Sequence, residues 1–200
     1  MNDHYFETVP DDLVLNYHLM HPGGDSAPGD PNLAYFLNNT YHLHYILRHP
    51  WTGSSAPAND AGRAFSFIHI TSPDMLHWTW QPTTLQPSFT GHGTFSGTGF
   101  VTNEGLPAAI YAGLSEPRHS FIAIAKDESL TQWRKPYALL PKDGPDDSDL
   151  KLLGDPDLFV IDNTYYIYSA GDNLELYRST DLQNWKHVGP FMQHDMQDVA

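Results

Sequence analysis

The sequence of 200 residues contains no cysteine, and it is poor in basic residues. Without cysteine, disulfide bonds and thiolate metal sites are excluded, and the redox compartment stays open. Ten Lys and Arg residues stand against 24 Asp and Glu residues, which gives a formal net charge of −14 at pH 7. Such a surface repels phosphate backbones and anionic membranes. We therefore expect no nucleic-acid partner and no membrane partner.

Long apolar runs and targeting segments are also missing. No run approaches the roughly 20 apolar residues that a membrane-spanning helix needs. The first 30 residues lack the basic start and apolar stretch of a signal peptide, so the cytoplasm is favoured over export. A neutral ligand, such as a carbohydrate, is compatible with the acidic charge and is the partner that we expect. A homo-oligomer is left open, and no cofactor is expected.

A repeated arrangement of short strands occurs three times along the chain. Each unit begins with a hairpin of two alternating, aromatic-rich runs, continues with a third strand, and closes with an Asp and a Trp. The hairpin turns are expected at Asn38-Asn39, Asn103-Glu104-Gly105 and Asp162-Asn163, and the closing tryptophans are Trp78, Trp133 and Trp185. Asn, Asp and Gly are the residues that tight turns with positive φ select. The Asp is expected to cap the last turn, and the Trp to pack between neighbouring units.

Three to four strands per unit, repeated about every 50 residues, predict a β-propeller. Blades are expected at residues 30–80, 92–136 and 152–192, after a lead-in strand and loop at 1–29. Closed propellers have about 4–8 blades. Residues 1–200 are therefore interpreted as the N-terminal part of one propeller domain, and a trimmed or decayed domain is the alternative.

The sequence Gly-Asp-Pro stands at the same place in the first and third units. It occurs at Gly29-Asp30-Pro31-Asn32 and at Gly154-Asp155-Pro156-Asp157. The innermost strand of each blade lines the central channel, so an Asp at the start of two such strands brings two carboxylates to one mouth. Each Pro is expected to hold the preceding Asp in an extended conformation. Two carboxyl groups with different roles are what glycoside hydrolysis requires. The alternative is an ordinary turn in which the Asp caps backbone amides.

Five motifs in this order carry a resemblance to a known family. They are Asn16-Tyr17-His18 leading to Gly29-Asp30-Pro31-Asn32, Tyr41–Tyr45, Ile68–Trp78, Thr94–Gly99 and Gly154-Asp155-Pro156. Over residues 16–192 the chain resembles glycoside hydrolase family 32, the five-bladed β-propellers that act on β-fructofuranosides. The resemblance implies an all-β, five-bladed propeller of which the N-terminal three or so blades are present. Gly154 stands where that family carries an Arg that would donate hydrogen bonds to sugar hydroxyls.

The resemblance also implies catalytic roles. Asp30 matches the nucleophile of a retaining mechanism, and Asp155 matches the carboxylate that holds sugar hydroxyls and stabilises the transition state. The acid/base Glu is expected beyond Ala200, at the start of a fourth blade. Glu104, Glu116 and Glu175 match no such motif. Residues 1–200 alone are therefore expected not to hydrolyse a glycoside.

Five further residues are candidates for sugar binding. Asn32 follows the nucleophile motif, and Phe95 and Ser96 belong to the Phe-Ser-Gly stretch. Trp51 lies in a Pro- and Ser-rich loop, and His69 is placed to reach the channel mouth. Ordinary strand packing is the alternative for Phe95, Ser96 and His69. His42 and His44 share one strand face, but no third ligand follows at a recognisable spacing, so no metal site is predicted. Two other functions stay open: a carbohydrate-binding propeller without catalysis, and a family-43-like arabinosidase or xylosidase.

Overall fold

The computed structural model describes residues 27–49, 61–115, 119–139, 154–170 and 175–192. Within these ranges the strands form three four-stranded antiparallel sheets, each in chain order. The first sheet contains β1 (Ala27–Leu37), β2 (Thr40–Arg48), β3 (Phe65–Ser72) and β4 (Thr79–Gln81). The second contains β5 (Thr94–Val101), β6 (Pro107–Gly113), β7 (His119–Ile124) and β8 (Tyr137–Ala138). The third contains β9 (Gly154–Ile161), β10 (Thr164–Ala170), β11 (Glu175–Ser179) and β12 (Lys186–Pro190).

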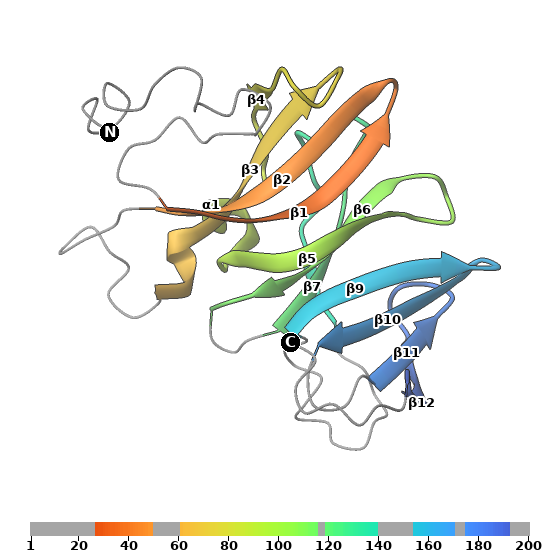
Figure 1. Ribbon diagram of the computed structural model, residues 1–200. Coiled ribbons are helices and arrows are strands. Elements are labelled where there is room, and N and C mark those ends of the chain that lie inside the picture. Colours follow the sequence, from red (N-terminus) through yellow and green to blue (C-terminus); the bar gives the residue numbers. More distant parts are fainter. Residues whose placement is uncertain (1–26, 50–60, 116–118, 140–153, 171–174, 193–200) are drawn as a thin grey trace.

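The three sheets follow one another like the blades of a partial propeller, with β5 between β1 and β9 (Figure 1). A 3₁₀ helix, Ala61–Ala64, precedes β3, and a four-residue helix, α1 (Pro87–Thr90), leads from the first sheet to the second. The all-β fold class predicted from the repeat is confirmed. Every helix in the described ranges is far too short to span a bilayer.

The hairpin turns were correctly located by their residue types. Asn38 and Asn39 have φ of 49° and 57°, and Asp162 and Asn163 have φ of 47° and 57°. Leu37 pairs with Thr40 across the first turn, so the loop has the two residues that tight hairpins favour. Gly105, in the longer turn of the second sheet, has φ of 81°. Positive φ is tolerated by Asn, Asp and Gly, which explains why these residues predict the turns.

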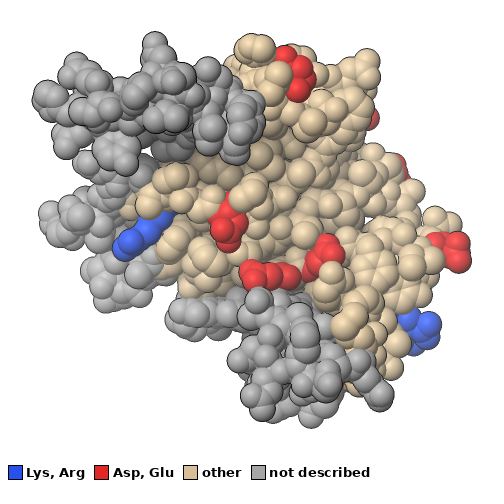
Figure 2. All heavy atoms as spheres, viewed as in Figure 1, with Lys and Arg blue, Asp and Glu red and all other residues tan. Residues whose placement is uncertain are grey.

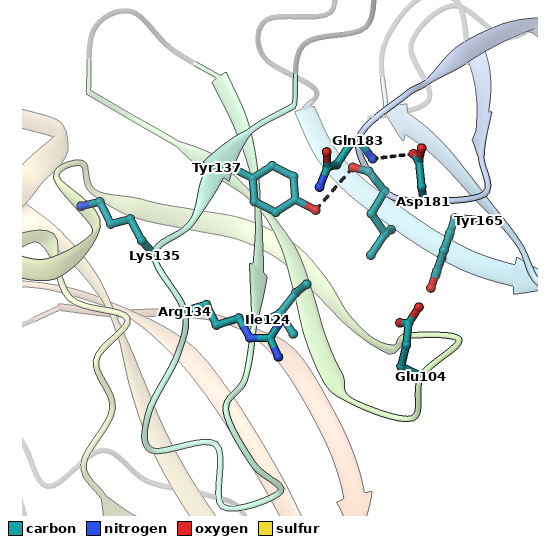
Figure 3. Close-up of a pocket in the computed structure, with 9 residues that line it drawn as sticks. Glu104, Ile124, Arg134, Lys135, Tyr137, Tyr165, Asp181 and Gln183 are labelled. Carbon is teal, nitrogen blue, oxygen red and sulfur yellow. Dashed lines mark hydrogen bonds between the residues drawn. The ribbon is translucent and has the colours of Figure 1, made fainter.

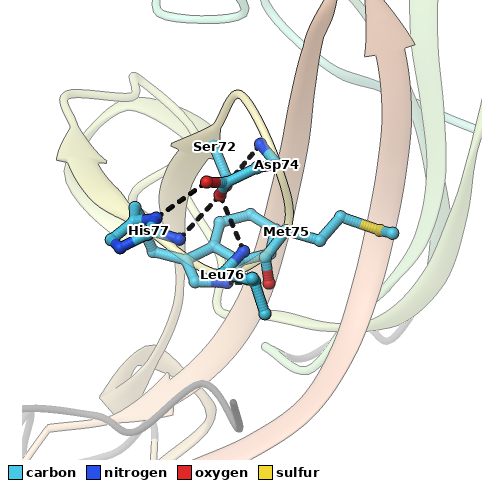
Figure 4. Close-up of polar contacts among 6 residues, drawn as sticks. Ser72, Asp74, Met75, Leu76 and His77 are labelled. Atoms are coloured by element: carbon cyan, nitrogen blue, oxygen red, sulfur yellow. Dashed lines mark hydrogen bonds and ion pairs between the residues drawn. The ribbon is translucent and has the colours of Figure 1, made fainter. Parts of the chain in front are cut away.

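In each blade, the Asp of the closing segment, which is the stretch from this Asp to the following Trp, caps a turn. Asp74 Oδ1 accepts hydrogen bonds from the backbone N–H groups of Leu76 and His77 at 2.9 and 2.8 Å, and Oδ2 lies 2.7 Å from His77 Nδ1 (Figure 4). These bonds hold the pKa of the Asp74 carboxyl well below its usual range. Asp181 repeats the arrangement, with Asn184 in place of His77. The predicted structural role of these aspartates is confirmed.

Two of the closing tryptophans fill the spaces between blades. Trp133 is 1% exposed and packs in a cluster that joins the first and second sheets, and Trp185 is 2% exposed in the cluster that joins the second and third. Each indole Nε1–H donates to a backbone carbonyl in its own closing, Leu130 for Trp133 and Leu182 for Trp185. Trp78 packs on the other face of the first sheet and is only half-buried. The predicted packing between blades is confirmed for Trp133 and Trp185.

Three histidines stack inside the first sheet. The His44 and His69 rings are parallel with centroids 4.3 Å apart, and His42 Nδ1 lies 3.1 Å from His69 Nε2. His44 and His69 are fully buried, and neither ring nitrogen of His44 has a hydrogen-bond partner. Burial, followed by the charge of His69, lowers the pKa of His44 well below its usual value, and burial lowers that of His69 to about 4.

This stack predicts that the fold loses stability in mild acid. The unfolded histidines take up protons near pH 6.5, whereas the folded ones stay neutral. Their contribution to stability is therefore fully present above pH 6.5 and falls as the pH drops toward 4. Between pH 7.5 and pH 5, the low pKa of His69 alone is expected to lower the free energy of unfolding by about 2 kcal/mol. Urea unfolding at the two pH values measures this loss.

The variant His44→Leu is expected to make the pH dependence shallower, because it removes one neutral, buried imidazole. His77→Asn is the matched control. In the third blade, Asn184 occupies the place of His77, and its side chain donates a hydrogen bond to the capping Asp181. An acid slope that is identical in His44→Leu and the native chain would contradict the assignment.

Candidate functional site

The first residues of β1, β5 and β9 line an open pocket with a volume of about 170 Å³. Each of the three blades contributes to it through its innermost strand. The lining residues are Asp30, Asn32, Ser96, Gly97, Thr98, Asp155 and Pro156. The two Gly-Asp-Pro sequences, 125 positions apart in the chain, thus present their carboxylates to one space.

The regular strand register is interrupted at the same place in all three blades. In β1, Gly29 and Asp30 together face Ile46; in β5, Phe95 and Ser96 face Ala112. In β9, Asp155 and Pro156 together face a single residue of β10. Such irregularities leave a residue out of the ladder and turn its side chain away from the normal alternation. Asp30, Ser96 and Asp155 therefore each lie in an interrupted stretch of an innermost strand, Asp30 and Ser96 as the second residue of the couple and Asp155 as the first.

One local prediction is corrected by the backbone. Both Gly-Asp-Pro sequences lie near the starts of β1 and β9, as expected. Asp155, however, is not extended, since its φ is 42°, although it precedes a proline. A non-glycine residue in this left-handed region costs of order 1–3 kcal/mol and persists only where its surroundings impose it. At Asp155 the interrupted register at the start of β9 imposes it, and this backbone sets the direction in which the carboxylate leaves the strand.

Asn32 ties the first blade to the second directly beside Asp30. Its side-chain Nδ2 donates to the backbone carbonyl of Asp30 at 2.7 Å, and its Oδ1 accepts from the backbone N–H of Gly97 at 2.9 Å. Thr98 plays a similar part between the second and third blades, where its Oγ1 accepts from the backbone N–H of Leu158 at 3.3 Å. The strands that carry Asp30 and Asp155 are thus fixed to the same central strand, β5.

The face that holds the pocket is acidic. Acidic side chains gather over the starts of β1 and β9, and the basic side chains visible on this face lie at its margins (Figure 2). Among the described residues that line the pocket, Asp30 and Asp155 are charged and none is Lys or Arg. Two carboxylates beside the hydroxyls of Ser96 and Thr98 can accept hydrogen bonds from a polyhydroxylated, uncharged ligand. The same setting repels an anionic one.

The other residues proposed from the sequence are placed differently. Ser96 lines the pocket, whereas Phe95 is half-buried and packs edge-on against Phe65, with ring centroids 5.3 Å apart. His69 is fully buried in the histidine stack of the first sheet, so the structure does not bring it to the pocket. Trp51 lies outside the described residues.

Sequence reasoning did not assign Gly97, Thr98 or Pro156 to the site. Thr98 follows Ser96 by two positions, and period-two alternation along a strand was the signal that could have found it. Gly97 has no side chain, and it contributes to the site through its backbone N–H, which donates to Asn32. This contact depends on the fold and has no signal in the sequence. In the described ranges, no group of three or more His, Asp or Glu residues is arranged to hold a metal ion.

Comparison with known proteins identifies the family of this chain. Residues 26–200 match the family model "Glycosyl hydrolases family 32 N-terminal domain". A β-fructofuranosidase, insoluble isoenzyme 7, of Oryza sativa subsp. indica is 31% identical over 172 residues, which cover 78% of this chain and 28% of that protein. Raffinose invertase of Escherichia coli is 27% identical over 195 residues, which cover 89% of this chain and 37% of that protein.

Among solved structures, fructan 1-exohydrolase IIa from Cichorium intybus superposes with a TM-score of 0.65 at 22% identity, over 91% of this chain and 35% of that one. At this identity the likeness shows the shared fold. The chain spans about a third of the length of these relatives. The family model covers every residue that the structure describes, and the chain therefore belongs to glycosyl hydrolase family 32, within its N-terminal domain.

Proposed function

We propose that this chain is the N-terminal part of a catalytic propeller that hydrolyses fructosides or related furanosides with retention of configuration. One observation carries the proposal: Asp30 and Asp155, from two different blades, line the same pocket. The relatives named β-fructofuranosidase and raffinose invertase support the fructoside class.

In the proposed mechanism the two carboxylates act at different stages. Asp30 attacks the anomeric carbon and forms a glycosyl-enzyme ester, which water then hydrolyses. Asp155 stays ionised, accepts hydrogen bonds from sugar hydroxyls and stabilises the positive charge that develops on the ring in the transition state. Asn32, through Gly97 and the Asp30 carbonyl, holds the nucleophile's backbone against β5.

Protonation of the leaving oxygen needs a third group. None of the described glutamates lies in the pocket: Glu175 is paired with His187 at 2.5 Å in the outer part of the third blade, and Glu104 lies in the β5–β6 turn. The proposal therefore assigns the acid/base role to a residue outside the described ranges. A carbohydrate-binding propeller without catalysis is the second candidate, because the described pocket holds two carboxylates and no proton donor of this kind.

The decisive test is turnover by the protein that carries this chain. Sucrose and inulin are the first substrates, with 4-nitrophenyl α-L-arabinofuranoside as the probe for a pentosidase. Proton NMR of the first-formed sugar distinguishes retention from inversion. Release of fructose with retention is expected. Release of arabinose alone would reassign the substrate, and saturable sugar binding without turnover would support the second candidate.

Asn32 gives a prediction on positioning. Asn32→Ala removes both side-chain hydrogen bonds beside the nucleophile, at a cost of about 1–2 kcal/mol in stability. Because small misplacements of a reacting group are costly, kcat for sucrose is expected to fall by about 10²-fold with a smaller change in KM. Thr40→Ala, which removes a side-chain bond in the β1–β2 turn, is the control and should keep native kcat. A change in KM alone for Asn32→Ala would indicate direct sugar binding instead.

A further inference from the structure

A second and larger pocket lies at the junction of the second and third blades, away from the carboxylate pair. Its volume is about 340 Å³, within the range of roughly 300–1,000 Å³ typical of small-molecule sites. Its walls come from the β5–β6 turn, β7, the segment before β8, β10 and the β11–β12 turn (Figure 3). A hydrogen bond joins the second blade to the third at this pocket: Tyr137 Oη donates to the backbone carbonyl of Leu182 at 3.4 Å.

This junction pocket lies toward the far end of the blades from the carboxylates. Tyr165, which lines it, pairs with Val160, five residues along β9 from Asp155. At about 3.3 Å per residue, the two sites are separated by roughly 17 Å along the strand. The lining residues of the two pockets do not overlap. A ligand in one is therefore distinct from a ligand in the other.

The lining of the junction pocket combines an apolar floor with polar groups of both signs. Ile124, Leu182 and the half-buried ring of Tyr137 supply the apolar part. Arg134 is exposed, and its guanidinium has no hydrogen bond or ion pair within the described residues. Lys135, by contrast, is already used, because its Nζ donates to the carbonyls of Phe89 and Thr90 and points away from the pocket (Figure 3).

One acidic group of the pocket, the Asp181 carboxylate, is held in place by hydrogen bonds. Asp181 accepts hydrogen bonds from the backbone N–H groups of Gln183 and Asn184, so its carboxylate is rigid. Glu104 stands across from it on the β5–β6 turn (Figure 3). An anion would meet two carboxylates here and a cation would meet Arg134. A neutral ligand with apolar C–H faces and many hydroxyls meets donors, acceptors and an apolar surface at once.

We propose that this junction pocket is a second, non-catalytic saccharide-binding site that takes one or two units of a neutral oligosaccharide. Tyr137, Ile124 and Leu182 contact the C–H face of a ring. Arg134 and the Gln183 amide donate to hydroxyls, and Glu104 accepts from them. The site does not depend on whether the carboxylate pocket is catalytic, because none of its residues belongs to that pocket.

The test uses the Asp30→Asn variant, in which turnover is blocked, labelled with ¹⁵N and titrated with 1-kestose and separately with maltotriose. The side-chain N–H signals of Arg134 and Gln183 report on the junction pocket. Saturable shifts of these signals with a millimolar Kd are expected. Adding Arg134→Ala should weaken this binding by about tenfold, since it removes a charged hydrogen-bond donor. Adding Asp155→Asn should leave it unchanged.

Lys126→Ala, an exposed basic residue of the same blade that lines neither pocket, is the matched control and should not alter the shifts. Arg134→Lys separates charge from geometry: a compact ammonium is expected to restore less than half of the lost affinity. The proposal is overturned by an absence of shifts at Arg134 and Gln183 in both titrations. It is equally overturned if the Kd that the Gln183 signal reports is the same in Arg134→Ala as without it, or if the shifts disappear in Asp155→Asn. Failure at this site leaves turnover at the carboxylate pocket untouched, so the two proposals fail separately.

Discussion

Asp30→Asn is expected to lower kcat for sucrose hydrolysis by about 10⁴-fold, the scale on which removal of a nucleophile acts in other enzymes. The amide keeps the size of the side chain and its place in the interrupted register of β1, but it cannot form the glycosyl ester. Asp30 is exposed and carries no hydrogen bond through its side chain in the described structure, so the fold should be unaffected. Steady-state kinetics and thermal unfolding of the same preparation measure the two effects.

Asp155→Asn is expected to act less severely, by about 10²–10³-fold in kcat, because it removes an electrostatic interaction with the transition state and no bond-forming atom. Asp162→Asn is the control for both variants. It also removes one carboxylate from the third blade, but it lies in the β9–β10 turn at φ 47°, a conformation that Asn accepts readily. Native kcat in Asp162→Asn is expected. Native kcat in Asp30→Asn would remove the nucleophile assignment, and with it the proposed mechanism.

The architecture could be predicted because it is encoded locally. Asn38-Asn39 and Asp162-Asn163 specify turns through their tolerance of positive φ. The closing Asp and Trp recur because in each blade the Asp caps a turn and the Trp packs against neighbouring residues. Trp133 and Trp185 are buried for the same reason in two different blades. Each turn or Asp-Trp motif alone is a weak indication of structure. Because the same motifs recur in three units at a similar spacing, together they indicate a repeated blade.

The site could be predicted only in part, because it is assembled from three strands that are distant in sequence. The pairing of Asp30 with Asp155 follows from the Gly-Asp-Pro sequence that recurs in the first and third units. The left-handed backbone of Asp155 does not, because a residue before proline is ordinarily extended and only the tertiary structure overrides that preference. His69 shows the opposite failure. Its residue type suggested a ligand contact, but its partners are two histidines on the neighbouring strand, which a single sequence cannot bring together.

Gly97→Ala is expected to destabilise the fold by about 3 kcal/mol or more, since a methyl group there has no space. A Cβ on Gly97 would lie 2.0 Å from the Ile110 carbonyl oxygen and 2.6 Å from Tyr111 Cα. Both are backbone atoms of β6, so relief requires β5 to move away from its partner strand. Tyr111 is fully buried in the cluster between the first two blades, and this movement would loosen that cluster too.

The same substitution disturbs the carboxylate pocket, because the Gly97 N–H holds Asn32 beside Asp30. Gly105→Ala is the matched control: its φ is 81°, and nothing lies within 4 Å of the added Cβ. That change carries the strain of a positive φ without a clash, at about 1 kcal/mol. Urea unfolding of both variants compares the two costs directly. Equal losses of stability would mean that β5 and β6 can separate at Gly97 without penalty, and that the close approach of these strands is not what fixes Asn32 and the nucleophile in place.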